Sequence, residues 1–479
     1  MKSSPIISGV VDAGLCCGCG ICAAACPRDH LAMGMNSVGE LNPGAVATCP
    51  DGCSICSAVC PYVPDAETSG VLAETVFGSV PGIQRTREMG HYLGCFAGYS
   101  AEAGHRANGA SGGMLTWTLE TLLREKRIDG ALCVEPASGP GQPLFRFAVC
   151  RTAEEIRRCS RSAYYPVEPG TILREILKLS EGRYAVTALP CVCKALRRAQ
   201  KFLPKFRERI AYMLGLTCGK GNSAFHVEAI CAATGGNPKG LESATFRVKS
   251  AGHAVANFAT RIVSRQAAGT IVDQTVHWHE PGGQGTWWGP RYFTPLACDL
   301  CDDLFAECAD AVFMDAWLPE YPDRQGTSLV VARSSEIQSL LAGADPAQCA
   351  LAPIDARRVA RSQRTAMISK RGALPARARQ AERSGVRPPP LRLELCRGYY
   401  QAGSERLAIA QWRLARESGK RWAETGGNLP RFRDAMRKWA DEAATAKRHC
   451  ERFRWLTLLM HPARWMEPVG RIWNWSDSR

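Results

Sequence analysis

The feature that most constrains this chain is a run of closely spaced cysteines near its start. Four cysteines are separated by two, two and three residues, and a proline follows the last: Cys16, Cys19, Cys22, Cys26 and Pro27. Thiolates three residues apart in a tight loop can converge on one compact metal cluster, and small residues between them let the backbone approach it. The spacing predicts a 4Fe–4S site of the bacterial ferredoxin type, in which the fourth cysteine ligates a second cluster.

A second run supplies cysteines for that second cluster, and its first gap is one residue longer. It consists of Cys49, Cys53, Cys56 and Cys60, followed by Pro61. A two-cluster module pairs the runs crosswise. We therefore expect one cluster on Cys16, Cys19, Cys22 and Cys60, and the other on Cys26, Cys49, Cys53 and Cys56. Cys17 is expected to be a neighbour rather than a ligand. Zinc is the alternative metal, although zinc sites rarely use four cysteines so close together.

The number of cysteines also indicates the compartment. The chain has 23 cysteines in 479 residues, begins without an apolar stretch of signal-peptide length, and contains no run of about 18 apolar residues. In a chain of this size, metal or redox use is favoured over disulfides. We expect a cytoplasmic protein in a reducing compartment, where thiolates survive as ligands.

The middle of the chain alternates helical and strand patterns, which predicts an α/β (α+β) catalytic domain. We expect a helix over residues 114–126, a second helical stretch over 194–201, and strands at 128–134, 184–189, 210–216, 255–263, 270–277, 311–314 and 328–332. The predicted organisation is a ferredoxin-like 2(4Fe–4S) domain at 1–66, a linker around 64–90, modules at 91–185 and 186–345, and a basic helical tail at 350–479, broken at 388–390.

Scattered motifs in the middle segment resemble the β subunit family of coenzyme F420 hydrogenases and dehydrogenases. That family also includes chlorophyll-pathway reductases for the 7-hydroxymethyl and 8-vinyl groups. The motifs, in chain order, are SGGMLT at 111–116, RIDGA at 127–131, LPC at 189–191, LGLTC at 214–218, CDLCD at 298–302, DAW at 315–317 and GTS at 326–328. Two positions depart from the family pattern: Ala163 replaces a lysine and Met314 a glycine.

The resemblance implies two further cofactor sites. A flavin-proximal 4Fe–4S cluster would fall on Cys191, Cys218, Cys298 and Cys301. FAD would lie near Ser111, Gly112, Gly113 and Thr116, where glycines and a helix N-terminus suit a pyrophosphate. Spacing alone would make the four cysteines ordinary core residues. No catalytic residue follows from the sequence; His253, His277 and His279 are candidate proton donors that are more simply structural.

The sequence thus predicts an iron–sulfur flavoprotein that passes electrons from ferredoxin or coenzyme F420 to FAD and an organic acceptor. The alternatives are an electron-transfer β subunit without its own substrate, and a zinc-binding interaction protein. Residues 351–479 hold 28 of the 60 Lys and Arg but only 12 of the 45 Asp and Glu. No nucleic-acid motif accompanies that charge, so a solvated helical face is expected there. Tryptophans and arginines at 452–475 suit either the inner face of an anionic membrane, contacted peripherally, or an acidic partner.

Overall fold

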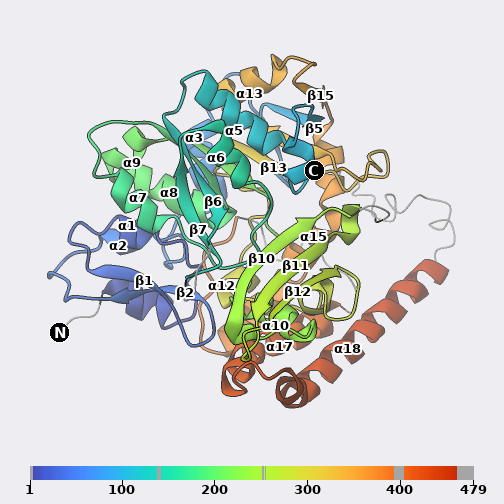
Figure 1. Cartoon of the computed structure of the whole chain (residues 1–479). Coiled ribbons are helices and arrows are strands. Elements are labelled where there is room, and N and C mark those ends of the chain that lie inside the picture. Colours follow the sequence, from blue (N-terminus) through green and yellow to red (C-terminus); the bar gives the residue numbers. More distant parts are fainter. Residues whose placement is uncertain (1–3, 138–141, 251–252, 254, 393–403, 461–479) are drawn as a thin grey trace.

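The computed structural model describes the chain except residues 1–3, 138–141, 251–252, 254, 393–403 and 461–479 (Figure 1). Its centre is a mixed sheet of eight strands in the order β15-β5-β14-β13-β9-β8-β6-β7. Strands β13, β9, β8 and β6 run parallel to one another, and their neighbours on either side are antiparallel. The bounds are β5 (Gly94–Ser100), β6 (Gly130–Pro136), β7 (Phe145–Cys150), β8 (Tyr184–Ala188), β9 (Ile210–Leu216), β13 (Ala311–Asp315), β14 (Ser328–Ala332) and β15 (Cys349–Pro353).

Alternating residues of these strands serve two separate cores, as the period of a strand requires. On β14, Val330 packs with α5 (Met114–Arg124) and α13 (Ser335–Ala342), whereas Leu329 and Val331 face the opposite side. That opposite side is covered by α8 (Pro190–Phe202) and by the cysteine-rich segment. Every predicted strand of the middle segment is present, with ends shifted by a few residues, and the mixed α/β architecture is confirmed.

The cysteine-rich segment is built from short elements that pack directly on the body. It holds η1 (Ile7–Val11), α1 (Ile21–Ala24), α2 (Ile55–Val59) and the hairpin β1 (Leu31–Met35) and β2 (Leu41–Ala45). Helix α1 contacts α7 (Gly170–Ile176), and α2 contacts α8. Arg174 on α7 donates to the carbonyls of Ala23 and Leu31, and Lys194 on α8 donates to that of Pro61.

A second, antiparallel sheet lies beside the central one and has its own core. It consists of β10 (Leu241–Val248), β11 (Ala259–Arg265) and β12 (Ile271–His277). Side chains from this sheet pack with α10 (Phe225–Ala233) and with the long helices α17 (Ser404–Glu424) and α18 (Leu429–Met460). Figure 1 shows α17 and α18 as the red hairpin below this sheet.

Short elements complete the described chain. They are α3 (Ser69–Phe77), β3 (Gln84–Thr86), β4 (Gly90–Tyr92), α4 (His105–Asn108), α6 (Ala153–Arg158), α9 (Pro204–Arg209), η2 (Pro238–Gly240), η3 (Val255–Asn257), α11 (Gln284–Trp288), α12 (Leu296–Asp299), α14 (Ala356–Ser362), α15 (Arg364–Met367), η4 (Ile368–Gly372) and α16 (Leu374–Arg383). No helix within the described ranges is long and apolar enough to cross a bilayer.

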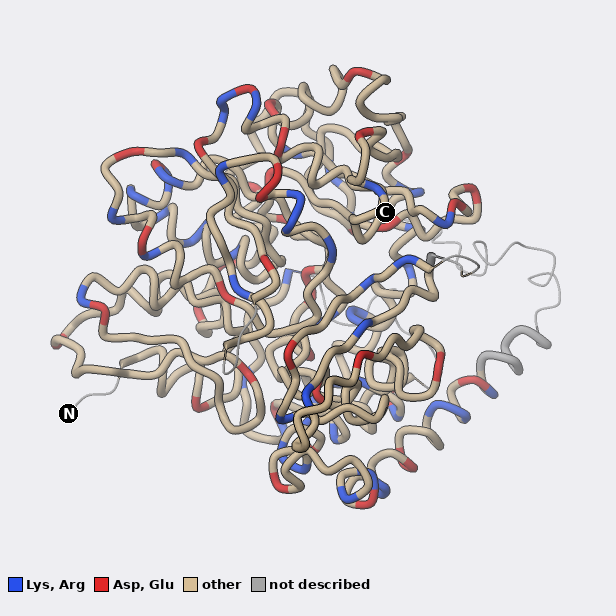
Figure 2. Tube along the Cα trace, in the orientation of Figure 1, with Lys and Arg blue, Asp and Glu red and all other residues tan. Residues whose placement is uncertain are grey.

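Two expectations about the organisation need correction. The predicted linker at 64–90 contains α3, whose buried residues Leu72, Ala73 and Phe77 pack it against the body. The C-terminal region is helical, as predicted, but its first part is not a solvated face, because Lys370, Arg371 and Arg377 are buried. The spacing of apolar residues does not predict that these cations are buried, because the groups that pair with them are distant in sequence. Farther on, acidic and basic residues alternate along α18 (Figure 2). The side chains of the predicted docking segment 452–475 lie almost entirely outside the described residues.

One buried arginine ties the central sheet to the loop that follows Cys301. Arg333, at the end of β14, is fully buried. Its guanidinium donates to five carbonyl oxygens at 2.9–3.3 Å, those of Met89, His91, Phe305, Ala306 and Ala309. A guanidinium offers five donors in a fixed plane, so this one residue donates to carbonyls from segments distant in sequence; the Ala306 carbonyl also accepts from the Ala309 N–H at 2.9 Å.

Replacing this arginine tests that role. Arg333→Leu keeps most of the volume but removes the guanidinium donor from five carbonyls, so we expect the free energy of unfolding to fall by about 3 kcal/mol. Urea unfolding followed by tryptophan fluorescence measures the change. Arg358→Leu, which removes a half-exposed arginine paired with Glu320, is the matched control and should unfold near the wild-type midpoint. Equal midpoints for the two variants would contradict the assigned role.

Candidate functional site

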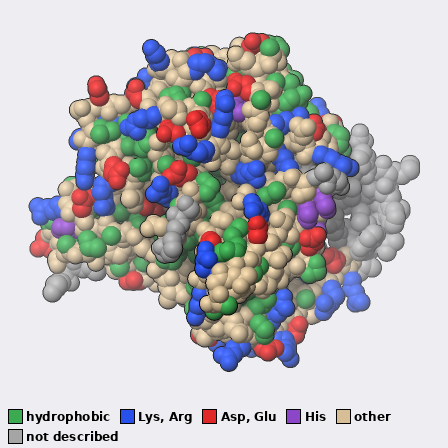
Figure 3. All heavy atoms as spheres, in the orientation of Figure 1, with side chains coloured by type: hydrophobic (Ala, Val, Ile, Leu, Met, Phe, Trp, Pro, Cys, Tyr) green, Lys and Arg blue, Asp and Glu red, His purple; other side chains and the backbone are tan. Residues whose placement is uncertain are grey.

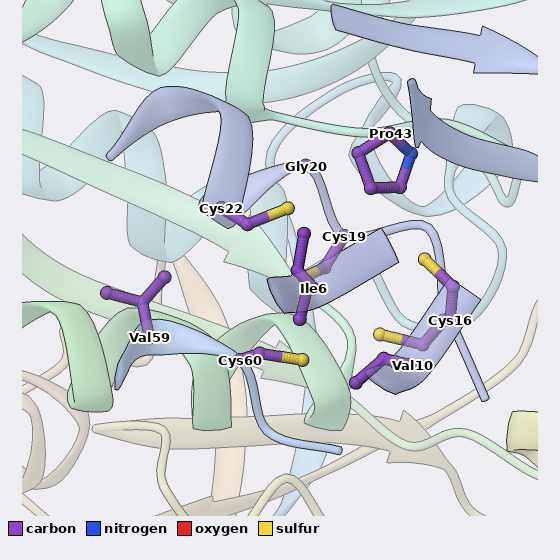
Figure 4. Close-up of a pocket in the computed structure, with 10 residues that line it drawn as sticks. Ile6, Val10, Cys16, Cys19, Gly20, Cys22, Pro43, Val59 and Cys60 are labelled. Carbon is purple, nitrogen blue, oxygen red and sulfur yellow. The ribbon is translucent and has the colours of Figure 1, made fainter. Parts of the chain in front are cut away.

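Four cysteines from the two runs surround one small cavity. Cys16 and Cys19 lie in the loop that leads into α1, Cys22 lies in α1, and Cys60 follows α2. All four line the cavity together with Cys17 and with apolar residues such as Ile6 and Val10. Figure 4 shows the sulfurs of Cys22 and Cys60 directed into this space. This is the crosswise set expected from the spacing, and we call it the N-terminal thiol group.

Glycines make the loop of this group possible. Gly18 and Gly20 both have φ +70, a region that L side chains rarely adopt. A Cβ on Gly18 would lie 2.9 Å from the carbonyl oxygen of Leu41, and one on Gly20 would meet the carboxylate of Glu168 at 2.1 Å. The loop therefore fits closely between the β1–β2 hairpin and the residues that precede α7.

Burial sets the electrostatics of these thiols. It raises the pKa of Cys60 to about 12, and it also raises the pKa of Cys16 and of Cys22, with the nearby thiols adding to the effect. Removing several protons from a buried group of this kind requires a compensating positive charge. A metal cluster supplies that charge, so the donor set suits a cluster bound through thiolates.

The remaining cysteines of the two runs are placed differently. Cys56 is buried with its sulfur 3.4 Å from the hydroxyl of Ser4, and the sulfur of Cys26 accepts from the His30 N–H at 3.3 Å. Cys49 and Cys53 are half-buried. Their grouping around a second N-terminal cluster stays a prediction.

A second thiol group forms where the ends of two parallel strands meet. Cys191 begins α8 just past β8, and Cys218 lies just past the adjacent β9. Cys298 in α12 and Cys301 after it complete the group. The Sγ of Cys298 accepts from the Gly221 N–H at 3.2 Å, and burial, followed by the charges of Cys218 and Cys191, raises its pKa. The four cysteines implied by the family resemblance are thus brought together, and we call them the strand-end thiol group.

A buried lysine faces this group, and no sequence pattern had indicated it. Lys370 in η4 is 2% exposed, and its Nζ donates to the Cys218 carbonyl at 2.9 Å. Burial opposes its charge, but the thiols of Cys301 and Cys218 raise its pKa. The lysine lies in an Arg-rich stretch that resembled a solvated face, so only the packing identifies it as a fixed positive charge beside four sulfurs.

The two thiol groups are neighbours. The thiol of Cys17 lies beside Cys19 of one group and Cys191 of the other, and the interaction raises its own pKa and lowers that of Cys191. Tyr62 is buried between them: its hydroxyl donates to the Ala297 carbonyl at 3.3 Å, and burial with the charges of Cys301 and Cys17 raises its pKa. Cys17, which the sequence predicted to be a neighbour rather than a ligand, lies where the N-terminal and strand-end thiol groups meet.

The predicted flavin loop lies on the backbone of the central sheet. Ser111 donates from its hydroxyl to the Thr327 carbonyl at 2.7 Å, and the Gly112 N–H donates to Ser328 Oγ at 3.0 Å. A Cβ on Gly112 would lie 2.7 Å from both the Gly98 oxygen and the Ser328 nitrogen. Gly113 has φ +77 at the start of α5, and Thr116 is buried one turn later. Close packing against β5 and β14 is therefore sufficient to explain why residue 112 is a glycine, without a bound ligand.

Basic side chains converge on this loop. Lys249 Nζ donates to the carbonyls of Ser111, Gln325 and Arg106, and Arg247 donates to the carbonyl of Ala110 at 2.7 Å. Burial, with the neighbouring Arg247 and Arg106, lowers the pKa of Lys249 to about 8. Arg247 is also paired with Asp315 at 2.6 Å and Arg106 with Asp323 at 2.6 Å, so carboxylates offset part of the positive charge beside the loop.

The three candidate proton donors make contacts of their own on the second sheet. The rings of His253 and His277 stack at 3.9 Å, and His277 Nδ1 lies 3.4 Å from Glu280. The backbone N–H of His279 donates to Asn257 Oδ1 at 3.2 Å. These contacts involve the rings of His253 and His277 and the backbone of His279, and the catalytic role of the three histidines stays a hypothesis.

Two family models match the chain, one after the other. Residues 95–174 match the model described as coenzyme F420 hydrogenase/dehydrogenase, beta subunit N-term, and residues 181–356 match the model for the C terminus of the same beta subunit. The chain belongs to the coenzyme F420 hydrogenase/dehydrogenase β-subunit family. The predicted family is therefore confirmed, over more than half of the chain. The matched ranges include the flavin loop and all of the strand-end thiol group.

The comparison with solved structures returns the F420-reducing NiFe hydrogenase complex from Methanosarcina barkeri. The match has 18% identity, covers 60% of this chain and 95% of that chain, and has a TM-score of 0.42. No curated protein matches the chain.

A buried ion pair supports the flavin loop from below, and its charge can be tested. Glu120 on α5 is bonded by His105 Nε2 at 3.1 Å and by Arg157 at 2.8 Å, and a Cβ on Gly113 would lie 2.9 Å from His105. Burial opposes ionisation, but these bonds hold the pKa of Glu120 below its usual value. A lowered carboxyl pKa adds stability above the ordinary pKa, and that stability is lost as the pH falls through the lowered value.

We expect Glu120→Gln to lower the free energy of unfolding by roughly 1–3 kcal/mol at pH 7, because charged hydrogen bonds are lost. The difference from wild type should shrink as the pH falls below about 4, where the wild-type carboxyl also becomes neutral. Urea unfolding at several pH values measures it. Glu154→Gln, at a position with an 84% exposed side chain, is the control. A difference that is constant with pH would contradict this account.

Proposed function

We infer that this chain is an iron–sulfur flavoprotein oxidoreductase. It takes electrons from a low-potential donor, ferredoxin or coenzyme F420, and delivers them through 4Fe–4S clusters and FAD to an organic acceptor. The observation that carries this inference is the contact between two buried thiol groups through Cys17, within a chain of the F420 hydrogenase/dehydrogenase β-subunit family. Clusters held so close together suit transfer of single electrons from one to the next.

The thiols themselves support iron rather than passive packing. The N-terminal thiol group and the strand-end thiol group each offer four sulfurs, and burial raises the pKa of most of them as free thiols. As neutral thiols such groups pack like small apolar side chains, whereas their thiolate forms need a bound cation in an apolar interior. We propose that each group holds one cluster and that Cys26, Cys49, Cys53 and Cys56 hold a third.

Lys370 would set the electrostatics of the strand-end cluster. A fixed positive charge next to the sulfurs stabilises the more negative, reduced state and so raises the reduction potential. Arg371, its neighbour, donates to the Asp302 carbonyl at 2.8 Å and so holds the segment that follows Cys301. The chain's contribution to electron transfer is this positioning of sulfurs and charges; the cofactors carry the redox chemistry.

The flavin would occupy the loop at 111–116. FAD converts single electrons into a two-electron transfer to an organic molecule. Its anionic pyrophosphate suits the cations of Arg106, Arg247 and Lys249 that surround the loop. Ala163 and Met314 differ from the family pattern at positions where the resemblance places flavin or substrate. The resemblance therefore does not single out coenzyme F420, and ferredoxin is proposed as a donor beside it.

The second candidate function is that of an electron-transfer β subunit whose substrate chemistry belongs to partner chains. The family description, which names a β subunit, favours it. The third candidate, a zinc-binding interaction protein, predicts colourless protein. On the face shown in Figure 3, acidic and basic side chains are interspersed, which offers no extended basic surface for nucleic acid among the described residues of that face.

Metal content tests the ligand sets. In protein purified without oxygen we expect iron and acid-labile sulfide, and Cys301→Ala or Cys60→Ala should each lower iron by about four atoms per chain. Iron and sulfide assays with electron paramagnetic resonance of the reduced protein measure this. Cys308→Ala, at a buried cysteine outside both groups, is the control and should retain all iron. Cys17→Ala should also retain it, because Cys17 is a neighbour and not a ligand.

Colourless wild-type protein with bound zinc would reject the cluster assignment. Iron retained in Cys301→Ala but lost in Cys308→Ala would reject the strand-end set alone.

Electron delivery tests the function itself. Mixed with reduced ferredoxin or reduced F420 without oxygen, the chain should show bleaching of bound flavin, and Cys301→Ala should slow that bleaching at least about tenfold, because its nearest cluster is missing. Stopped-flow absorbance measures the rate, with Cys308→Ala as the control. Flavin reduction without turnover of any organic acceptor until partner subunits are added would favour the β-subunit role. No flavin reduction by either donor would contradict the proposal.

A further inference from the structure

A third gathering of cysteines lies apart from both thiol groups. Cys133 is on β6, Cys150 ends β7, and Cys159 caps the C-terminus of α6. The Sγ atoms of Cys150 and Cys159 are 3.5 Å apart. Cys133 lies near both of the others, and their thiols raise its pKa. Neither the motifs nor the family resemblance singled out these positions, because they are 17 and 9 residues apart and share no cysteine motif.

Strand pairing and one helix bring the three together. In the antiparallel register Ala131 faces Cys150 and Cys133 faces Ala148, so Cys133 and Cys150 are diagonal neighbours on one face of the sheet. Thr152 caps α6 and forms a reciprocal capping box with Glu155, which fixes the turn between β7 and α6. Helix α6 then returns Cys159 to the end of β7. The approach of the sulfurs is thus set by two rigid elements and a fixed turn.

The placement suits chemistry at sulfur. Cys133 and Cys150 are buried, at 3% and 2% exposure, whereas Cys159 is partly exposed. Strand β7 is the last strand of the central sheet, so the group lies at the periphery of the sheet. The neighbouring thiols of Cys133 and Cys159 lower the pKa of Cys150 to about 4, with Arg158 adding to the effect, whereas burial and Glu155 oppose it. A buried cysteine whose sulfur lies beside that of a partly exposed cysteine is the arrangement that thiol–disulfide exchange requires.

We propose that Cys150 and Cys159 form a reversible disulfide when the protein meets a small disulfide oxidant such as glutathione disulfide. The two sulfurs need to approach by about 1.5 Å to reach the bond length of about 2.05 Å. Side-chain rotation supplies a movement of that size without breaking β7 or α6. Cys133, which lies near both, is the third thiol and can exchange into the bond.

The exchange balances in two steps. One thiolate of the pair attacks a sulfur of glutathione disulfide, which forms a protein–glutathione mixed disulfide and releases one glutathione thiolate. The second cysteine, after losing its proton, attacks the protein sulfur of that mixed disulfide and releases the second glutathione thiolate. The two protons lost by the protein protonate the two leaving thiolates. Overall, two protein thiols are oxidised to one disulfide, and glutathione disulfide is reduced to two glutathione molecules.

The position of the bond links it to the flavin loop. The chain leaves Cys159 through Arg161, which has φ 92, and reaches Tyr164. The hydroxyl of Tyr164 hydrogen-bonds to Arg247, the residue that donates to the Ala110 carbonyl next to the flavin loop. A disulfide at Cys159 would fix the start of this segment and so restrain the residues beside that loop.

Peptide mapping tests the proposal on the full chain. The protein is incubated without oxygen with glutathione disulfide, free thiols are blocked with iodoacetamide, and tryptic peptides are analysed by mass spectrometry. We expect a cross-link between residues 147–151 and 159–161 in most chains, and dithiothreitol should remove it. In Cys159→Ser and Cys150→Ser the cross-link should be absent. Cys349→Ser, at a buried cysteine on the opposite edge strand β15, should form it as wild type does.

Two further outcomes decide the assignment. Cys133→Ala should form the same cross-link, because Cys133 is not one of the two bonded sulfurs. If glutathione becomes attached to other cysteines while 147–151 and 159–161 stay separate, the proposal is wrong. Because the readout is a covalent bond between two peptides, it does not depend on iron, flavin or turnover. The cross-link can therefore form even if the proposed electron-transfer function fails, and the reverse also holds.

Discussion

Burial of thiol sulfurs is the constraint on which the rest of this structure depends. The N-terminal and strand-end thiol groups place sulfur in an apolar interior, where burial raises the pKa of residues such as Cys60 and Cys218 to about 12. Ionising a thiol in an apolar interior costs free energy unless a positive charge lies nearby. Lys370 provides one fixed charge, and a bound cluster would provide the remainder. As neutral thiols these cysteines pack like small apolar side chains, and as thiolates they need a bound cation.

Charged side chains hold the loops that present these sulfurs. Arg333 donates hydrogen bonds to five carbonyls between residues 89 and 309. Arg371 donates to the Asp302 carbonyl, next to Cys301. Glu307, buried between Arg371 and Arg392, is bonded to Arg392 at 2.8 Å. These contacts join segments far apart in the sequence around one short loop, so the strand-end group is positioned by its surroundings rather than by local structure.

In the loop at 111–116, the physical reason for the glycine motif differs from the reason that the motif suggested. The glycines at 112 and 113 match the family pattern, and close approach to a pyrophosphate was the expected reason for them. The structure supplies a different reason, since a Cβ at Gly112 would collide with the backbone of Gly98 and Ser328. Cations lie beside the loop, and two of them, Arg247 and Lys249, come from a segment more than 100 residues away in sequence.

The sequence by itself determined the family, the mixed α/β architecture and the core strands of the middle segment, because periodicity and ordered motifs are local properties. The spacing of the first cysteines and the family resemblance predicted which cysteines would gather, and those ligand sets stay predictions. Tertiary structure alone decided the contacts between distant segments. Those contacts make Cys17 the link between the two groups, bury Lys370 beside four sulfurs, convert the expected linker into α3, and bring Cys150 within 3.5 Å of Cys159. The physical reason is that burial and long-range packing decide whether a cysteine or a lysine is solvated, and neither property is encoded in spacing along the chain.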